Sequence, residues 1–194
     1  MSPGDPPTFP TARRGALFDQ LLALFLDQGF VHLTLDDIAA RLHCSKSTLY
    51  TLARSKDDLV RAVTVHFFRA ATEDVERAVI PGAPARERIA SYLAAVGRAL
   101  GAASPQFMAD LNGFAPAREV YETNTRIASR RVQQLIADGV AAGEFRDVHA
   151  AFAAELAATM MVSIQQGRVH EHTGLDDAAA YRELAAILTA GINA

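Results

Sequence analysis

Apolar residues along this chain recur every three to four positions, which is the spacing of one face of an α-helix. The first series is Phe18, Leu21, Leu22 and Phe25, and Gly29 follows it as a C-cap. The alternating pattern typical of strands is not evident. The sequence therefore predicts an all-α protein of about nine helices, which cover approximately residues 11–28, 35–42, 46–52, 56–79, 89–100, 105–111, 116–143, 149–169 and 176–192.

The first three predicted helices fall within a short N-terminal segment. Thr34 and Ser45 can cap the second and third helices, because their hydroxyl groups can accept hydrogen bonds from the free N–H groups of the first turn. Only a tight turn separates these two helices, and Lys56 begins the fourth. This spacing is typical of a helix-turn-helix unit.

The third helix of this unit has a polar and an apolar side. Its polar arc comprises Lys46, Ser47, Tyr50 and Thr51, and its apolar arc comprises Leu49, Leu52 and Ala53. A helix with such a polar arc suits the major groove of DNA, where base edges can be read. The alternative is an ordinary solvated helical hairpin, since residues 1–65 hold seven basic and seven acidic side chains. The pattern alone leaves both interpretations open.

The order of residues favours DNA binding. The stretch "GFVHLTLDDIAARLHCSKSTLYTLARSKDDL" closely resembles the DNA-binding segment of the tetracycline-repressor (TetR) family of transcription regulators, and the resemblance covers about residues 14–61. It implies that Thr34 caps the second helix against a phosphate and that Lys46 and Ser47 face base edges. It also implies that Thr48 and Tyr50 contact backbone or bases and that Lys56 holds a phosphate. Thr51 joins these candidates through its place on the polar arc.

Two positions depart from the family pattern. The family usually has His or Tyr where this chain has Leu52, and Phe where it has Ala53. A leucine side chain cannot donate a hydrogen bond to a phosphate, so we expect no DNA role for Leu52 and a weaker anchoring to the DNA backbone. Ala53 leaves space that a larger neighbour or a shifted helix would have to fill.

The resemblance also predicts the organisation of the whole chain. We expect a proline-rich, flexible N-terminal arm over residues 1–12, a helix-turn-helix DNA-binding domain over residues 13–60, and an effector-binding and dimerisation domain over residues 61–194. The resemblance implies homodimers that form through the last two helices. In the stretch 149–169, many side chains are those of alanine, which are small enough for two helices to pack closely. An alanine-rich core within one chain remains the alternative. A two-fold dimer would bind a palindromic double-stranded DNA operator.

The family likewise implies a pocket for a small apolar or aromatic effector among the helices of the second domain. Candidate lining residues are Phe107, Met108, Leu111, Phe114, Tyr121, Met160, Met161 and Gln165. Each of them could equally be a core residue. An effector would release DNA if it preferred a conformation with the wrong spacing of recognition helices.

Composition changes this interpretation little. The net charge of −3 gives no general signal for polyanions, and the single cysteine, Cys44, excludes an internal disulfide. No phosphate-binding loop or nucleophile–base motif is present, so we predict no catalytic residue, no metal site and no cofactor. No apolar stretch reaches the roughly 18 residues of a membrane span, and a cytoplasmic location is expected.

The residue pattern and the resemblance to the TetR family therefore predict a ligand-responsive transcriptional regulator that acts as a repressor. The runner-up is a helical enzyme or metal-binding protein that uses His170 and His172, although residues two apart do not share a helix face. A third possibility is a regulator with lost or altered operator binding, which the departures at Leu52 and Ala53 would fit.

Overall fold

The computed structural model describes residues 11–192, so residues 1–10 of the predicted arm lie outside the described residues. Thr11 and Ala12, the last two residues assigned to that arm, belong to the first helix. The all-α prediction is confirmed. The described residues form ten helices: α1 (Thr11–Gln28), α2 (Leu35–Arg41), α3 (Lys46–Tyr50), α4 (Lys56–Ala78), α5 (Ala85–Gly101), α6 (Pro105–Gly113), α7 (Ala115–Ala141), α8 (Ala150–Gln165), α9 (Arg168–Thr173) and α10 (Asp177–Gly191).

The additional helix arises from a break in the segment predicted as one helix over 149–169. Gly167 adopts a φ of 74°, in the left-handed region that favours glycine, and this ends α8 and sets a new direction for the short helix α9. Gly174, with a φ of 73°, ends α9 in the same way. The count is therefore ten in the described range.

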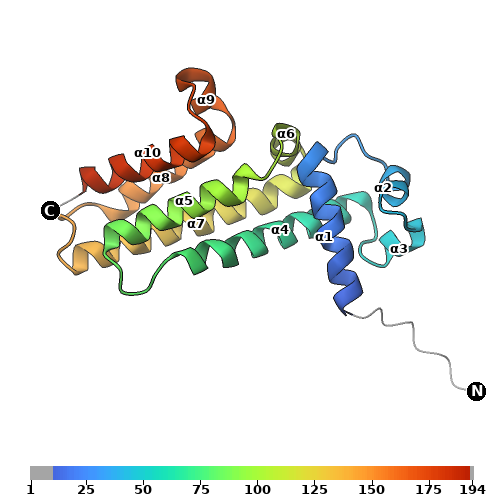
Figure 1. The fold of residues 1–194 in the computed structure, drawn as a ribbon, viewed down its shortest axis with the longest axis horizontal. Coiled ribbons are helices and arrows are strands. Elements are labelled where there is room, and N and C mark those ends of the chain that lie inside the picture. The colour runs from blue at the N-terminus through green and yellow to red at the C-terminus, as the bar shows by residue number, and fades with distance from the viewer. Residues whose placement is uncertain (1–10, 193–194) are drawn as a thin grey trace, which may run out of the picture.

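The long helices form a bundle along the long axis of the molecule, and α1, α2 and α3 lie at one end of it (Figure 1). In the bundle α4 packs against α5 and α7, while α10 packs against α5 and α8. The helix α9 projects from the bundle between α8 and α10 (Figure 1). Within the described residues no helix is both long and apolar enough to cross a membrane.

One hydrophobic core connects the N-terminal helices with the bundle. It includes Leu21 and Phe25 of α1, Phe67 of α4 and Leu188 of α10. The α1 side chains meet the bundle at a group of aromatic rings centred on Phe30, whose ring centroid lies 5.3 Å from that of Phe25. Burial of these large apolar side chains holds α1 against the bundle, and α2 and α3 follow α1 at the same end of the molecule.

Candidate nucleic-acid interface and internal cavity

A capping box begins α2 and holds its first turn. The Thr34 hydroxyl accepts a hydrogen bond from the Asp37 N–H at 3.1 Å, and the Asp37 carboxylate accepts one from the Thr34 N–H at 2.8 Å. Hydrogen bonds from Thr34 lower the pKa of Asp37 below its ordinary value. The predicted cap at Thr34 is therefore present, and it is exposed at the end of the molecule.

The candidate recognition helix, α3, is short and capped. It spans Lys46–Tyr50, whereas the sequence pattern extended it to Leu52. The Ser45 hydroxyl accepts a hydrogen bond from the Thr48 N–H at 3.1 Å. Thr51 is the C-cap, and its hydroxyl donates to the Thr48 carbonyl at 2.6 Å.

The two faces of α3 agree with the sequence pattern. The side chains of Lys46, Ser47, Tyr50 and Thr51 are all exposed, and that of Tyr50 is 52% accessible. Leu49 is buried on the opposite side, with only 1% exposure. Thr48 is half-buried and its hydroxyl lies 2.8 Å from that of Ser45, so it supports the start of the helix. The exposed arc presents hydroxyl, phenol and ammonium groups together, which is the chemistry that reads base edges and phosphates.

Both lysines of the chain already have partners in this structure. Lys46 forms an ion pair with Asp36 of α2 at 2.8 Å, and this hydrogen bond raises the pKa of Lys46 above its ordinary value. Lys56 is half-buried and donates to the Val31 carbonyl at 2.7 Å. An ammonium group has three N–H donors, so each lysine retains donors that could meet DNA.

The residues Leu52 and Ala53 are half-buried and pack against the hydrophobic core. Their apolar character therefore belongs to the packing of the connection between α3 and α4. Nothing in the structure identifies a particular side chain that fills the space beside Ala53.

The turn between α2 and α3 has an unusual residue. His43 adopts a φ of 49°, in the left-handed region, which is unfavourable for any residue with a Cβ atom. The Cys44 N–H donates to the Ala39 carbonyl at 3.0 Å and closes the end of α2. Burial raises the pKa of the half-buried Cys44 thiol, so the thiol is held in its less reactive form.

A buried carboxylate on α6 joins the helix-turn-helix segment to the bundle. One oxygen of Asp110, Oδ2, accepts hydrogen bonds from the backbone N–H groups of Phe30 at 2.6 Å and Val31 at 2.8 Å. Its other oxygen, Oδ1, accepts one from Gln106 at 2.7 Å. Asp110 is 6% exposed. We call this group the Asp110 junction.

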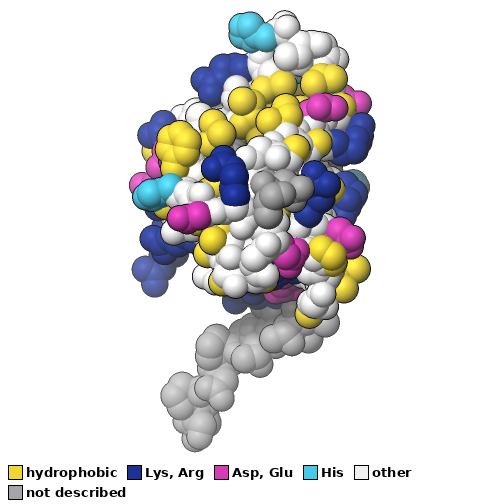
Figure 2. Space-filling model, turned by 90° about the vertical axis from the view of Figure 1, so that its left-hand side faces the viewer, with side chains coloured by type: hydrophobic (Ala, Val, Ile, Leu, Met, Phe, Trp, Pro, Cys, Tyr) yellow, Lys and Arg dark blue, Asp and Glu magenta, His cyan; other side chains and the backbone are white. Residues whose placement is uncertain are grey.

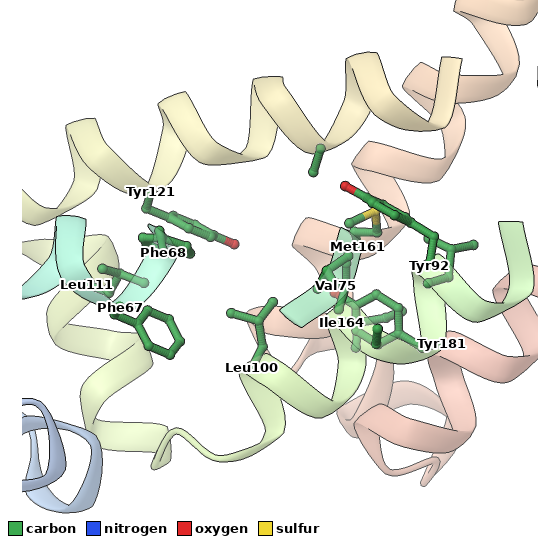
Figure 3. Close-up of a cluster of buried hydrophobic side chains, with 14 of the residues drawn as sticks. Phe67, Phe68, Val75, Tyr92, Leu100, Leu111, Tyr121, Met161, Ile164 and Tyr181 are labelled. Carbon is green, nitrogen blue, oxygen red and sulfur yellow. The ribbon is translucent and has the colours of Figure 1, made fainter. Parts of the chain in front are cut away.

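A cavity lies inside the bundle between α4, α5, α7 and α8. The volume that the centre of a water-sized sphere can occupy in it is about 50 Å³, so the cavity is narrow. Three of the predicted effector-binding residues line it, namely Tyr121, Met161 and Gln165. Figure 3 shows Tyr121 and Met161 at this place in the core, together with Phe68, Val75 and Leu100, which also line the cavity.

The other predicted lining residues lie elsewhere. The rings of Phe107 and Phe114 pack against Phe30, and Leu111 is fully buried in the hydrophobic core. Met108 borders a separate groove between α5, α6 and the end of α8. Met160 is 40% exposed on the outer side of α8, whereas its neighbour Met161 points inward. These five residues are absent from the lining of the cavity.

Two hydrogen-bonded sets of polar side chains lie at the cavity. The Tyr121 hydroxyl donates to the Gln165 side-chain oxygen, and the Gln165 amide donates to the Tyr181 hydroxyl at 2.8 Å. Burial raises the pKa of Tyr121 to about 12, and burial also raises the pKa of Tyr181. The second set is the ion pair of Arg131 with Glu76, at 2.9 Å and 3.1 Å from the two carboxylate oxygens.

Sequence reasoning missed the residues of the second set and also Tyr92. Tyr92 is 5% exposed and lines the cavity, and burial followed by the nearby charge of Glu76 raises its pKa. A phenol within the apolar stripe Ile89, Leu93 and Val96 was a usable signal for it. The pair Glu76 and Arg131 is separated by 55 residues, so no local pattern could have linked the two.

The outer faces of α8 and α10 carry unusually exposed apolar side chains. Phe152, Leu156 and Met160 follow one another at four-residue intervals on α8, and they are 72%, 55% and 40% exposed. Ile187 of α10 is 69% exposed. Figure 2 views the end of the molecule far from α3 and shows hydrophobic side chains gathered in the half where α8 and α10 lie. We call these four side chains the apolar face.

His170 and His172, the candidate metal ligands, each place a ring nitrogen near a backbone carbonyl oxygen. His170 Nδ1 lies 3.0 Å from the Leu175 carbonyl and His172 Nδ1 lies 2.6 Å from that of Arg168. In the part of the chain that the structure describes, no three His, Cys, Asp or Glu side chains are grouped as metal ligands would be.

Comparison with known protein families gives a match for the N-terminal segment alone. Residues 17–63 match the family described as bacterial regulatory proteins, tetR family. A search of curated protein sequences found no significant match.

Solved structures share the fold over nearly the whole chain. A transcriptional regulator of Saccharomonospora viridis, solved in complex with choline, is 17% identical, covers 95% of this chain and 100% of its own, and has a TM-score of 0.79. A transcriptional regulator of Cytophaga hutchinsonii is 16% identical, with coverage of 94% and 100% and a TM-score of 0.74. The ketosteroid transcriptional regulator of Mycobacterium tuberculosis is 18% identical, with coverage of 96% and 97% and a TM-score of 0.63.

Proposed function

We infer that this chain is a member of the TetR family of bacterial regulatory proteins, which its residues 17–63 match. We further infer that it is a repressor that binds a palindromic operator as a homodimer and is released by a small molecule. The observation that carries this proposal is the exposed polar arc of α3. The opposite face of α3 is buried through Leu49, so the helix presents its polar residues to solvent. The helix lies within the segment that matches the family.

The DNA-binding residues follow from this arrangement. Lys46, Ser47, Tyr50 and Thr51 would enter the major groove, and the capped start of α2 at Thr34 would face a phosphate. Thr48 would act mainly through the start of α3. Lys56 would hold a phosphate with the donors that its bond to the Val31 carbonyl leaves free.

The dimer would form through the apolar face of α8 and α10. A monomer that left Phe152, Leu156 and Ile187 in water would forgo the favourable burial of large apolar side chains. A two-fold axis through this face would place two copies of α3 for two half-sites of one operator. On this proposal, residues 13–60 form the DNA-binding domain and residues 61–194 the effector-binding and dimerisation domain.

The effector would bind in the cavity beside Tyr121, Met161 and Gln165. The regulator of Saccharomonospora viridis was solved with choline, and that of Mycobacterium tuberculosis carries ketosteroid in its name, so proteins of this fold are connected with small organic molecules. An effector would release DNA if it bound more tightly to a conformation in which the two α3 helices no longer fit successive half-sites.

A gel-shift titration of the whole protein with DNA that flanks its own gene tests the proposal. We expect a discrete shifted complex that specific competitor DNA removes and unrelated DNA does not. Lys46→Ala and Ser47→Ala should change which base pairs are preferred, whereas Lys56→Ala should weaken all duplexes alike. Absence of a shifted complex at low salt would refute the proposal.

A further inference from the structure

The cavity has a defined shape. Phe68 and Glu76 both line it and are eight residues apart on α4, so the slot follows that helix for about 12 Å. Between them the walls are mainly apolar, with Val75, Val96 and Leu100 among the lining residues. The interior therefore suits a long, narrow and mainly apolar molecule.

Charge inside the cavity is balanced. Among its described lining residues only Glu76 and Arg131 are charged, and they are paired with each other at 2.9 Å. A ligand with a carboxylate would approach Glu76, and a ligand with an ammonium group would approach Arg131. The side chains of Arg131 and Glu76 are 33% and 41% exposed, so this pair lies at the edge of the cavity. A charged group placed deeper, among the apolar walls, would leave water without a partner, which is unfavourable.

One polar group in the cavity has no partner. The Tyr92 hydroxyl takes part in none of the hydrogen bonds among the described residues, and although 95% of the residue is buried, this oxygen is still open to solvent. Figure 3 shows the hydroxyl groups of Tyr92 and Tyr121 pointing into the same interior space. The Tyr121 hydroxyl already donates to Gln165, so Tyr92 is the group with its full hydrogen-bonding capacity free.

The cavity is open to one side. A surface groove between α4 and α7 shares four lining residues with it, namely Phe68, Thr72, Asn124 and Ile127. Ile127 is 51% exposed at this mouth, and the Thr72 hydroxyl lies 3.4 Å from the Asn124 side-chain oxygen. The side of the cavity between α4 and α7 is therefore the one through which a ligand would enter.

From these observations we propose that the effector of this protein is uncharged, elongated and mainly apolar, with one hydroxyl or carbonyl oxygen that bonds the Tyr92 hydroxyl. This inference rests on the proposed effector role of the cavity and adds the chemical class of the effector.

Four probes that share the same two rings test this class: 4-phenylphenol, biphenyl, biphenyl-4-carboxylate and the trimethylammonium derivative of biphenyl. Isothermal titration calorimetry of the whole protein with each should give the tightest binding for 4-phenylphenol. Tyr92→Phe should weaken 4-phenylphenol by about fivefold to tenfold, the usual effect of one hydrogen bond, and leave biphenyl unchanged. Biphenyl thus serves as the matched control.

Removal of one charge from the Glu76–Arg131 pair gives a second test. Glu76→Gln leaves Arg131 unpaired, so biphenyl-4-carboxylate should gain affinity while 4-phenylphenol changes little. Arg131→Gln leaves Glu76 unpaired and should favour the trimethylammonium probe instead. Thermal unfolding of each variant shows whether it is folded, and Tyr92→Phe, which breaks no bond in the structure, keeps the test open if either charge variant does not fold.

Three outcomes would overturn the inference: tighter binding of either charged probe to the parent protein, equal losses for 4-phenylphenol and biphenyl in Tyr92→Phe, or no binding of any probe. The gel-shift titration separates this failure from failure of the proposed function. A protein that shifts operator DNA but binds no probe refutes the effector class alone, and a protein that binds 4-phenylphenol but shifts no DNA refutes the regulator alone.

Discussion

Removal of the carboxylate at the Asp110 junction should destabilise the protein in a graded way. In Asp110→Leu the backbone N–H groups of Phe30 and Val31 both lose their acceptor, and the N–H of Phe30 is in a buried bond. An unsatisfied buried donor costs about 1–3 kcal/mol, and the partly buried Val31 group lies at the lower end of that range. We therefore expect a loss of about 2–5 kcal/mol.

The isosteric change should cost much less. Both backbone donors bond the same oxygen, Oδ2, so in Asp110→Asn a side-chain oxygen can still accept from them. The amide nitrogen would then face Gln106, whose own amide can turn to offer its oxygen. Only the additional strength of a charged acceptor is lost, which is about 1 kcal/mol.

Urea unfolding followed by circular dichroism measures both changes. Asp147→Leu is the control, because that carboxylate is exposed, and its effect should stay within about 0.5 kcal/mol. The reasoning is refuted if Asp110→Leu lies within that margin, or if Asp110→Asn is as damaging as Asp110→Leu.

Three further predictions concern backbone conformation and assembly. Gly29→Ala should lower the free energy of unfolding by about 2–4 kcal/mol, because φ is +78° there and the new Cβ would lie 2.6 Å from Asp110 Oδ2. An unchanged midpoint in urea unfolding would contradict this packing. His43→Val should be less stable than His43→Gly by about 1–2 kcal/mol, because only glycine tolerates a φ of 49° freely, and equal thermal midpoints would count against this. Phe152→Asp together with Leu156→Asp should give a monomer in sedimentation velocity, and a persistent dimer would place the interface elsewhere.

Local signals in the sequence were sufficient for most of the fold. Thr34 and Ser45 are polar residues directly before apolar periodicity, and both cap helices as predicted. The prediction of one helix over 149–169 was wrong at Gly167, where the chain breaks into α8 and α9. A glycine inside a periodic stretch is compatible with either a continuous helix or a left-handed turn.

The interior of the bundle was less predictable. Met160 and Met161 are adjacent and chemically identical, yet one is exposed and the other lines the cavity, because successive residues on a helix point about 100° apart. The bond of Asp110 with Phe30 joins residues 80 positions apart. Such contacts depend on tertiary packing, and a single sequence contains no local sign of them.

The salt dependence of operator binding tests the central claim most directly. The claim is that a dimer places two α3 helices in DNA and holds the flanking phosphates through Thr34 and Lys56 of each protomer. With a labelled duplex from the flanking DNA, log K measured by fluorescence anisotropy should fall linearly with log salt. A dimer with roughly eight phosphate contacts predicts a slope of about −7, and Lys56→Ala, which removes one contact in each protomer, should reduce it by about 2. A flat salt response would contradict the account.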